Sequence, residues 1–380
     1  MYPYLIIFFV TAFFALNSFN QKGTNAKFFF TYIVAVAVFV GISDMLGGYD
    51  RYIYCEVFSS NSESFKNGNY FGNDLYNLYF AKEPIYGLIN TLIGLITPNR
   101  YIFILIYTLI VYVIYGICFY RYTSKPFFAL LVFSGLMFFF TFTYLRQVLA
   151  TGIIWLSLPY YKERKTTKFL IMIIIASMIH NSALIMILLY LIPLKKWPFG
   201  RIMIVMFLLF ILGLIGVGGM FAVVGGLTGN ENISSHASAA EYGFRYEYVI
   251  ESFFFLFLLY KNYGNIAKDK ESLSYLNLFL MFCGILLLFC KSSDGGRIAW
   301  YGVMGVIIML TSFCNKERGS VLKISLTFLF FFLYLRILLA WGVLLSPYKT
   351  FFTNGVREGD FIYELYEYDH NYDQDKFYNL

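Results

Sequence analysis

Residues 101–120 read YIFILIYTLIVYVIYGICFY, a run of apolar and aromatic side chains that carries no charge. An α-helix rises about 1.5 Å per residue, so this run is about 30 Å long and matches the hydrocarbon core of a bilayer. Arg100 and Arg121 bound the run and would lie at its two ends. The sequence therefore predicts a membrane-spanning helix here.

Similar runs recur along the chain, which is 59% hydrophobic and 13% charged, outside the range of soluble proteins. We predict an all-α polytopic membrane protein with about 10–12 transmembrane helices. Expected spans are residues 3–19, 28–43, 101–120, 127–143, 202–226, 247–260, 275–290, 298–314 and 321–345, with a weaker one at 148–161.

Charge between the runs predicts the topology. Basic linkers at 21–27, 121–125, 162–168, 194–201, 261–270 and 315–323 are expected in the cytoplasm. They account for the net charge of +7, so we expect no nucleic acid partner. Because the basic residues follow the first run, it is expected to be a retained span rather than a signal peptide.

The domain organisation follows from the same pattern. We expect a single transmembrane helical domain over residues 1–345, with an outer loop at 44–83 that carries a polar motif. Residues 346–380 are expected to form an acidic, aromatic extracytoplasmic tail.

Two apolar segments do not fit as simple crossings. Residues 84–97 are short for a span and favour a re-entrant or interfacial helix. Residues 168–193 have basic clusters on both sides, which predicts two half-helices that meet at His180 and Asn181. Broken helices at membrane depth line water or are buried in protein, so this arrangement predicts a polar chamber. The alternative is one long tilted helix with a hydrogen-bonded histidine.

Polar side chains that are costly near lipid gather on the predicted outer side. A charge at the bilayer centre costs about 2.5–3.5 kcal/mol, so arginines there often line a pathway or a site. The outer set comprises Tyr49, Asp50, Arg51, Glu83, Arg146, Gln147, Arg245, Asp294 and Arg297.

Two arginines in this set are candidate anion ligands. Arg146 follows the aromatic run 138–145, and its planar fork suits phosphate oxygens, although a snorkelling arginine at the interface is the alternative. Arg297 follows Gly295 and Gly296, which allow close backbone approach to an anion, although a plain turn before a helix has the same sequence.

Proton transfer has three candidate groups. His180 is the only histidine in a predicted span and is either a general base, a donor to phosphate or a buried structural group. Asp50 and Glu83 are candidates for gripping or deprotonating a sugar hydroxyl, or are simply solvated. Tyr49 and Tyr54 belong to an aromatic group that either stacks on sugar rings or forms an interfacial belt.

The five cysteines predict no disulfide framework, because only Cys55 lies away from an apolar span, where we expect one exposed thiol. The sequence has no spacing typical of a metal site and no nucleotide loop, so we expect neither metal nor cofactor.

Four motifs in order give the chain a family resemblance. The stretches GYDRYIYCEVF at 48–58, EPIYGLIN at 83–90, LRQVLA at 145–150 and IASMIHNSAL at 175–184 resemble elements of the EpsG-like branch of the Wzy polysaccharide polymerases. The stretch DGGR at 294–297 is the equivalent of a late family arginine, whereas residues 363–380 have no counterpart.

The resemblance implies a multi-pass protein of the bacterial cytoplasmic (inner) membrane whose active site faces the outside or periplasm. It implies a glycosyltransferase that polymerises oligosaccharide repeat units linked to undecaprenyl diphosphate, for O-antigen, capsule or exopolysaccharide. The lipid diphosphate is already an activated leaving group, so the reaction needs no metal from the protein. Expected partners are membrane lipid, a flippase and a chain-length regulator.

We assign the site on this basis. Arg146 and Arg297 are expected to bind the diphosphate, and Arg51 a second phosphate or an acidic sugar. His180, with Asp50 or Glu83, is expected to act on the acceptor hydroxyl. The remaining substrate contacts are assigned to Tyr49, Tyr54, Gln147, Arg245 and Asp294.

Other functions remain open at this stage. A membrane ligase or acyltransferase that modifies the glycan would use a similar chamber. A lipid-linked sugar flippase or transporter would need access from both faces and commonly shows internal repeats, which this sequence lacks. A structural partner in an export complex is a further alternative.

Overall fold

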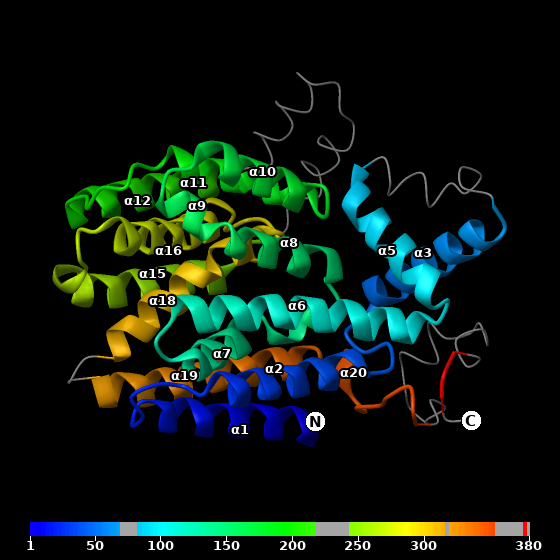
Figure 1. The fold of residues 1–380 in the computed structure, drawn as a ribbon. Coiled ribbons are helices and arrows are strands. Elements are labelled where there is room, and N and C mark those ends of the chain that lie inside the picture. The colour runs from blue at the N-terminus through cyan, green and yellow to red at the C-terminus, as the bar shows by residue number, and fades with distance from the viewer. Residues whose placement is uncertain (69–81, 217–242, 316–318, 354–374, 378–380) are drawn as a thin grey trace. The chain divides into compact units, whose positions relative to one another are not determined.

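The computed structural model describes residues 1–68, 82–216, 243–315, 319–353 and 375–377. These residues are mainly helical, and their only β-type pairing is an isolated bridge between Ser43 and Thr350 (Figure 1). The α-helices are α1 Tyr2–Ser18, α2 Ala26–Gly41, α3 Tyr49–Lys66, α5 Pro84–Ile96, α6 Arg100–Tyr122, α7 Pro126–Leu136, α8 Leu145–Leu156, α9 Leu158–Lys162, α10 Thr166–Ser177, α11 Ile187–Leu191, α12 Phe199–Ile215, α15 Tyr246–Asn262, α16 Lys270–Leu288, α17 Gly295–Ala299, α18 Val303–Cys314, α19 Gly319–Ala340 and α20 Gly342–Leu345. The 3-10 helices are η1 Phe138–Phe142, η2 Asn181–Met186, η3 Tyr263–Asn265 and η4 Trp300–Gly302.

The predicted fold class is confirmed: this is an all-α polytopic membrane protein. Among the described residues, four helices are long and apolar enough to cross a bilayer, namely 100–122, 270–288, 295–314 and 321–340. Eight shorter apolar helices of 10–17 residues accompany them. The end of the predicted span 202–226 lies outside the described residues, as does most of the C-terminal tail.

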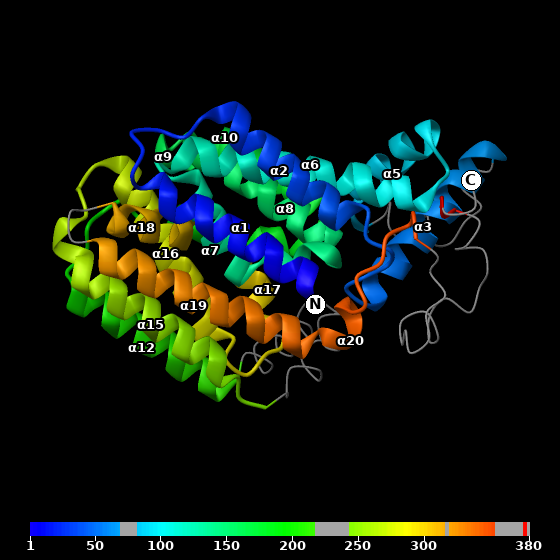
Figure 2. The same cartoon turned by 90° about the horizontal axis from the view of Figure 1, so that it is seen from below.

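The chain folds into two compact units. The first contains residues 1–156, 171–184 and 314–380, and the second contains 157–170 and 185–313. In the first unit α2 packs on α6, and α7 packs on both α1 and α19 (Figure 2). In the second unit α16 is the central helix and contacts α12, α15 and α17 (Figure 1). The single membrane domain expected over 1–345 stays a prediction.

Local sequence signals set several helix starts. Asn99 caps α6 by accepting hydrogen bonds from the backbone N–H groups of Tyr101 and Ile102, at 2.9 and 3.1 Å. Pro84 and Pro126 stand at the first positions of α5 and α7, where the missing N–H costs nothing. The start of α5 places Glu83 directly before the helix.

The segment 168–193 is broken where the sequence predicts. Helix α10 ends at Ser177, His180 is non-helical, and the chain continues through η2 into α11. The start and end of the segment lie side by side, because Arg164 Nη1 donates to the Tyr190 carbonyl oxygen at 2.7 Å and the Phe169 and Tyr190 rings stack. The chain therefore forms a helical hairpin with its apex near His180.

The first polar segment differs from its prediction in two ways. Residues 44–83 were expected to be a loop, but 49–66 form the helix α3. Its polar motif has helical spacing, which places Asp50 and Tyr54 one turn apart on the same face. The expected exposure of Cys55 is wrong, because this thiol is fully buried, as are the other four cysteines.

Helix packing in the second unit depends on a glycine that the sequence pattern indicates. A Cβ at Gly213 of α12 would overlap the Leu287 carbonyl oxygen of α16. The glycine therefore allows the two helices to approach closely, as expected for small residues in membrane proteins. The rest of the glycine-rich run, 217–226, lies outside the described residues.

Candidate functional site

Three of the four sequence motifs meet around Arg146 in the first unit. Arg146 stands in the first turn of α8, and its Nη1 forms an ion pair with the Oε2 atom of Glu83, the residue before α5. Its Cζ lies 5.3 Å from the centre of the Tyr54 ring and 5.7 Å from that of Tyr86. The guanidinium is thus held by one carboxylate and two aromatic faces.

The hairpin apex joins this cluster through the backbone. The N–H groups of Ile85 and Tyr86 both donate to the Met178 carbonyl oxygen, at 3.0 and 3.4 Å. The Asn181 N–H donates to Glu83 Oε1 at 3.3 Å. Glu83 therefore accepts from Arg146 with one oxygen and from the apex with the other, so α5, α8 and the hairpin position a single carboxylate.

Hydrogen bonds between three side chains orient His180. Gln147 Nε2 donates to Ser182 Oγ at 3.5 Å, and Ser182 Oγ lies 2.7 Å from His180 Nδ1. The Ser182 backbone N–H also points at Nδ1, at 3.4 Å. Because a backbone N–H only donates, Nδ1 acts as the acceptor, and the neutral imidazole carries its proton on Nε2.

The environment of Glu83 raises its pKa. The residue is only 5% exposed, and burial disfavours the charged carboxylate. The charge and hydrogen bond of Arg146 oppose this shift, as does the Asn181 N–H. The charge of Lys82 opposes the shift as well, but its effect is smaller than those of Arg146 and Asn181, so a group that competes for Arg146 should raise the pKa of Glu83 further.

Arg51 does not join the cluster. Its side chain is 0% exposed, and its guanidinium donates to the carbonyl oxygens of Leu46, Phe142, Val40 and Ser43, at 3.2, 3.1, 3.4 and 2.9 Å. This geometry favours a structural role that ties α3 to the ends of α2 and η1. It argues against the phosphate contact expected from the sequence.

The other α3 candidates lie at the edge of the arrangement. Tyr49 is 56% exposed, and Asp50 is half-buried in the first turn of the helix. Asp50 forms no ion pair within the described residues. Tyr54, one turn further on, is 4% exposed and reaches the ring contact with Arg146.

The remaining candidates form a separate group in the second unit. Arg297 Nη2 pairs with Asp294 Oδ1 one helical turn before it, and both side chains are more than a third exposed. The Arg245 N–H donates to the Cys290 carbonyl oxygen at 2.8 Å, and the Tyr248 hydroxyl to that of Ser293 at 3.1 Å. A diphosphate site shared by Arg297 and Arg146 stays a prediction.

Sequence reasoning missed several residues of the Arg146 cluster, although their positions were signalled. Asn181 and Ser182 directly follow His180, and Tyr86 follows Glu83 by three residues. Each makes its contact through the backbone N–H, a hydroxyl or a ring face. Asn181 reaches Glu83, Tyr86 reaches Arg146, and Ser182 reaches Gln147 only when the hairpin, α5 and α8 are packed together.

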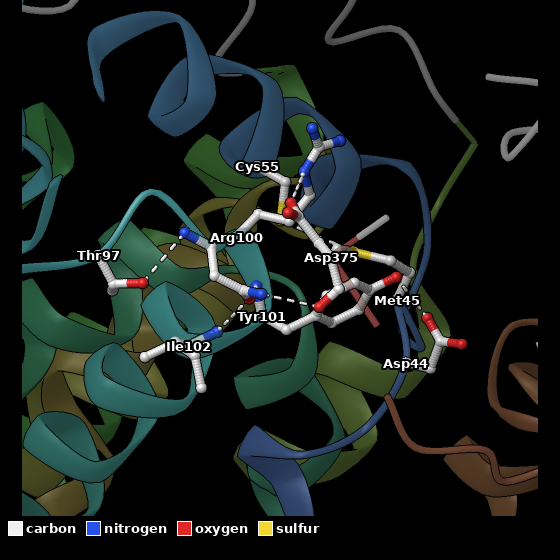
Figure 3. A network of polar contacts seen from close by, with 9 residues as sticks. Asp44, Met45, Cys55, Thr97, Arg100, Tyr101, Ile102 and Asp375 are labelled. Carbon is white, nitrogen blue, oxygen red and sulfur yellow. Dashed lines mark hydrogen bonds and ion pairs between the residues drawn. The ribbon is translucent and has the colours of Figure 1, made fainter. Parts of the chain in front are cut away.

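A second polar network below α3 was not expected at all (Figure 3). Arg100 Nε donates to Asp375 Oδ2 at 2.8 Å, and the Tyr101 hydroxyl donates to Asp44 Oδ1 at 2.8 Å. Lys376 Nζ lies 3.2 Å from Asp44 Oδ2, and both of these side chains are fully buried. The described end of the C-terminal tail is thus tied to the start of α6.

Within the described residues, no group of three or more His, Cys, Asp or Glu side chains is placed to hold a metal ion.

Comparison with known proteins places this geometry in a family context. A family model described as the EpsG family matches residues 27–350, which include all four motifs, the whole second unit and most of the first. No curated protein and no solved structure matches the chain.

Proposed function

Because the chain belongs to the EpsG family, a family of Wzy-like polysaccharide polymerases, we propose that it joins oligosaccharide repeat units linked to undecaprenyl diphosphate. The reaction takes place on the outer face of the bacterial cytoplasmic membrane. The observation that carries the proposal is the cluster of Arg146, Glu83 and His180, assembled from three distant motifs in one unit.

Arg146 binds the diphosphate of the donor. Its planar fork matches phosphate oxygens, and a preorganised cation stabilises the negative charge that develops as the lipid diphosphate leaves. The ring faces of Tyr54 and Tyr86 hold the guanidinium in place, so little reorganisation is needed when the anion arrives.

Glu83 acts as the general base. An incoming diphosphate competes with Glu83 for the guanidinium of Arg146. Since Arg146 lowers the pKa of Glu83, weakening this pair raises the pKa and makes the carboxylate a stronger base. Donor binding thus prepares the carboxylate to accept a proton from the acceptor hydroxyl.

His180 acts as a hydrogen-bond donor. With Nδ1 accepting from Ser182, the neutral imidazole carries its proton on Nε2, the tautomer that can donate to a phosphate or sugar oxygen. This favours the donor role over the general-base role among the alternatives that the sequence leaves open. Gln147 acts indirectly, through Ser182.

The bond changes balance without a further reactant. The acceptor hydroxyl oxygen forms a bond to the anomeric carbon of the growing chain, and Glu83 receives the hydroxyl proton. The bond between that carbon and the diphosphate oxygen breaks, and undecaprenyl diphosphate leaves with the electron pair. The energy of the activated donor drives the transfer, which is consistent with a reaction that needs no nucleotide.

The test is polymer laddering in cells that produce Arg146→Ala or His180→Ala at normal abundance. We expect single repeat units to replace the ladder in Arg146→Ala and short chains in His180→Ala. The matched control is Arg336→Ala, which removes an exposed arginine from α19 of the same unit and should leave the ladder unchanged. Unchanged chain length in both test variants would end the site assignment.

A further inference from the structure

An apolar groove lies in the second unit, and no residue of the proposed reaction lines it. It is bounded by α11, α12 and α16 and has a volume of about 440 Å³, within the range of about 300–1,000 Å³ typical of ligand pockets. Its walls are almost entirely Leu, Ile, Val and Met side chains, with Trp197, Arg201 and Asn277 as the exceptions that carry polar atoms.

The groove runs lengthwise between α12 and α16. Its α12 wall consists of residues 201, 202, 205, 206 and 209, which share one helix face, and its α16 wall runs from 277 to 288. Eight residues of helix rise about 12 Å, close to the depth of one bilayer leaflet. Gly284 leaves room in the middle, since a Cβ there would lie 2.9 Å from Leu209 Cδ1.

Asn277 supplies a buried acceptor to the groove. Its Nδ2 donates to the Tyr161 hydroxyl and to the carbonyl oxygens of Pro193 and Ile192, at 2.9, 3.2 and 3.5 Å. The two carbonyls fix the amide orientation, because only the NH₂ group can donate to them. The Oδ1 atom has no hydrogen-bond partner among the described residues, although Asn277 is only 1% exposed.

A buried acceptor without a partner is costly, so this atom indicates a ligand with a hydroxyl donor. Arg201 adds a cation to the same groove and stacks on Trp197, with Cζ 4.9 Å from the ring centre. Lys195 and Lys196 precede them in a linker that we expect in the cytoplasm. Basic and aromatic groups beside an apolar groove are typical of binding sites for anionic lipid headgroups.

We infer that this groove binds one anionic glycerophospholipid of the inner leaflet, with a hydroxyl-bearing headgroup. One acyl chain lies between α12 and α16, the phosphate pairs with Arg201, and a headgroup hydroxyl donates to Asn277 Oδ1. The site is separate from the proposed reaction, so its test is a binding measurement.

The experiment titrates the purified full-length protein in detergent with phosphatidylglycerol or phosphatidylcholine and follows bound lipid by native mass spectrometry. Phosphatidylglycerol carries the charge and the hydroxyl donors that phosphatidylcholine lacks. We expect phosphatidylglycerol to bind about tenfold more tightly, and Arg201→Ala to reduce this preference, since the hydroxyl contact with Asn277 remains. The matched control is Arg121→Ala, which removes an arginine that also lies over an aromatic ring but does not line this groove.

A second pair of variants tests the groove itself. Val205→Trp places a large ring in the groove and should reduce binding of both lipids. Leu208→Trp makes the same change on α12 at an exposed position that does not line the groove, and should bind like the natural protein. Equal binding of the two lipids, equal behaviour of Arg201→Ala and Arg121→Ala, or full binding by Val205→Trp would each overturn the inference.

Discussion

Arg51 and Arg146 lie in the same unit, and both stand near the start of a helix, yet their guanidinium groups have opposite surroundings. Arg51 is fully buried and donates to four backbone carbonyls. Arg146 is 21% exposed and contacts a carboxylate and two rings. A guanidinium satisfied by backbone carbonyls stabilises the fold, whereas one that pairs with a side-chain carboxylate can exchange that partner for a substrate anion.

The largest effect should come from removing the structural arginine. Arg51→Ala takes the guanidinium donor from four buried carbonyls, of which that of Val40 keeps the Ser43 hydroxyl, and should cost about 4 kcal/mol in the free energy of unfolding. We expect the protein to disappear from the membrane, as measured by immunoblot of membrane fractions. Normal abundance of Arg51→Ala together with lost polymer would show that Arg51 belongs to the site after all.

Arg146→Lys should keep the protein at normal abundance in the membrane but lose activity, the opposite of what we expect for Arg51→Ala. Lysine keeps the charge but loses the planar fork that matches phosphate, so we expect polymerisation to fall about 100-fold at normal abundance. The measurement is the rate of repeat-unit consumption per protein molecule in isolated membranes. A lysine variant with the natural rate would mean that Arg146 contributes charge alone, and the contrast with Arg51 would lose its chemical basis.

These two arginines also show what a sequence can predict. The membrane fold and the family follow from apolar run lengths and from four short motifs, because both depend on residues close together in the chain. The hairpin break at His180 follows from the charges that flank 168–193. The role of Arg51 does not, since carbonyl acceptors have no sequence signature. The pairing of Glu83 with Arg146 joins residues 63 positions apart and needs the packed helices.

Glu83→Gln tests whether the carboxylate in the Arg146 cluster acts as a base. Burial raises the pKa of Glu83, so on acidification the carboxylate is protonated at a higher pH than an ordinary glutamate. Activity that needs the carboxylate should therefore fall as the pH drops through this raised pKa. We expect Glu83→Gln to be about 100-fold slower, with no acid limb in its rate profile.

The rate profile is measured with the purified enzyme over a series of buffers. Asp50→Asn is the control, because Asp50 is the other carboxylate considered as the base and lies at the edge of the cluster. If Asp50→Asn loses the acid limb and Glu83→Gln keeps it, Asp50 is the general base. Glu83 then acts only as the ion-pair partner of Arg146.

Ser182→Ala should have the smallest effect of the series. It removes the hydroxyl that links Gln147 to His180 but keeps the backbone N–H that points at Nδ1. Loss of one such hydrogen bond is worth about 1 kcal/mol, so we expect a rate about fivefold lower. Because Ser182 acts through His180, Ser182→Ala should have no further effect in a His180→Ala background, and additive losses would contradict this coupling.

The most direct measurement is polymerisation by the purified protein in liposomes, supplied with undecaprenyl-diphosphate-linked repeat units and no nucleotide. We expect the natural protein to lengthen the glycan and to release undecaprenyl diphosphate. We expect Arg146→Ala to leave single units, while Arg336→Ala behaves like the natural protein. Chain growth by Arg146→Ala at the natural rate would show that the reaction takes place elsewhere in the molecule.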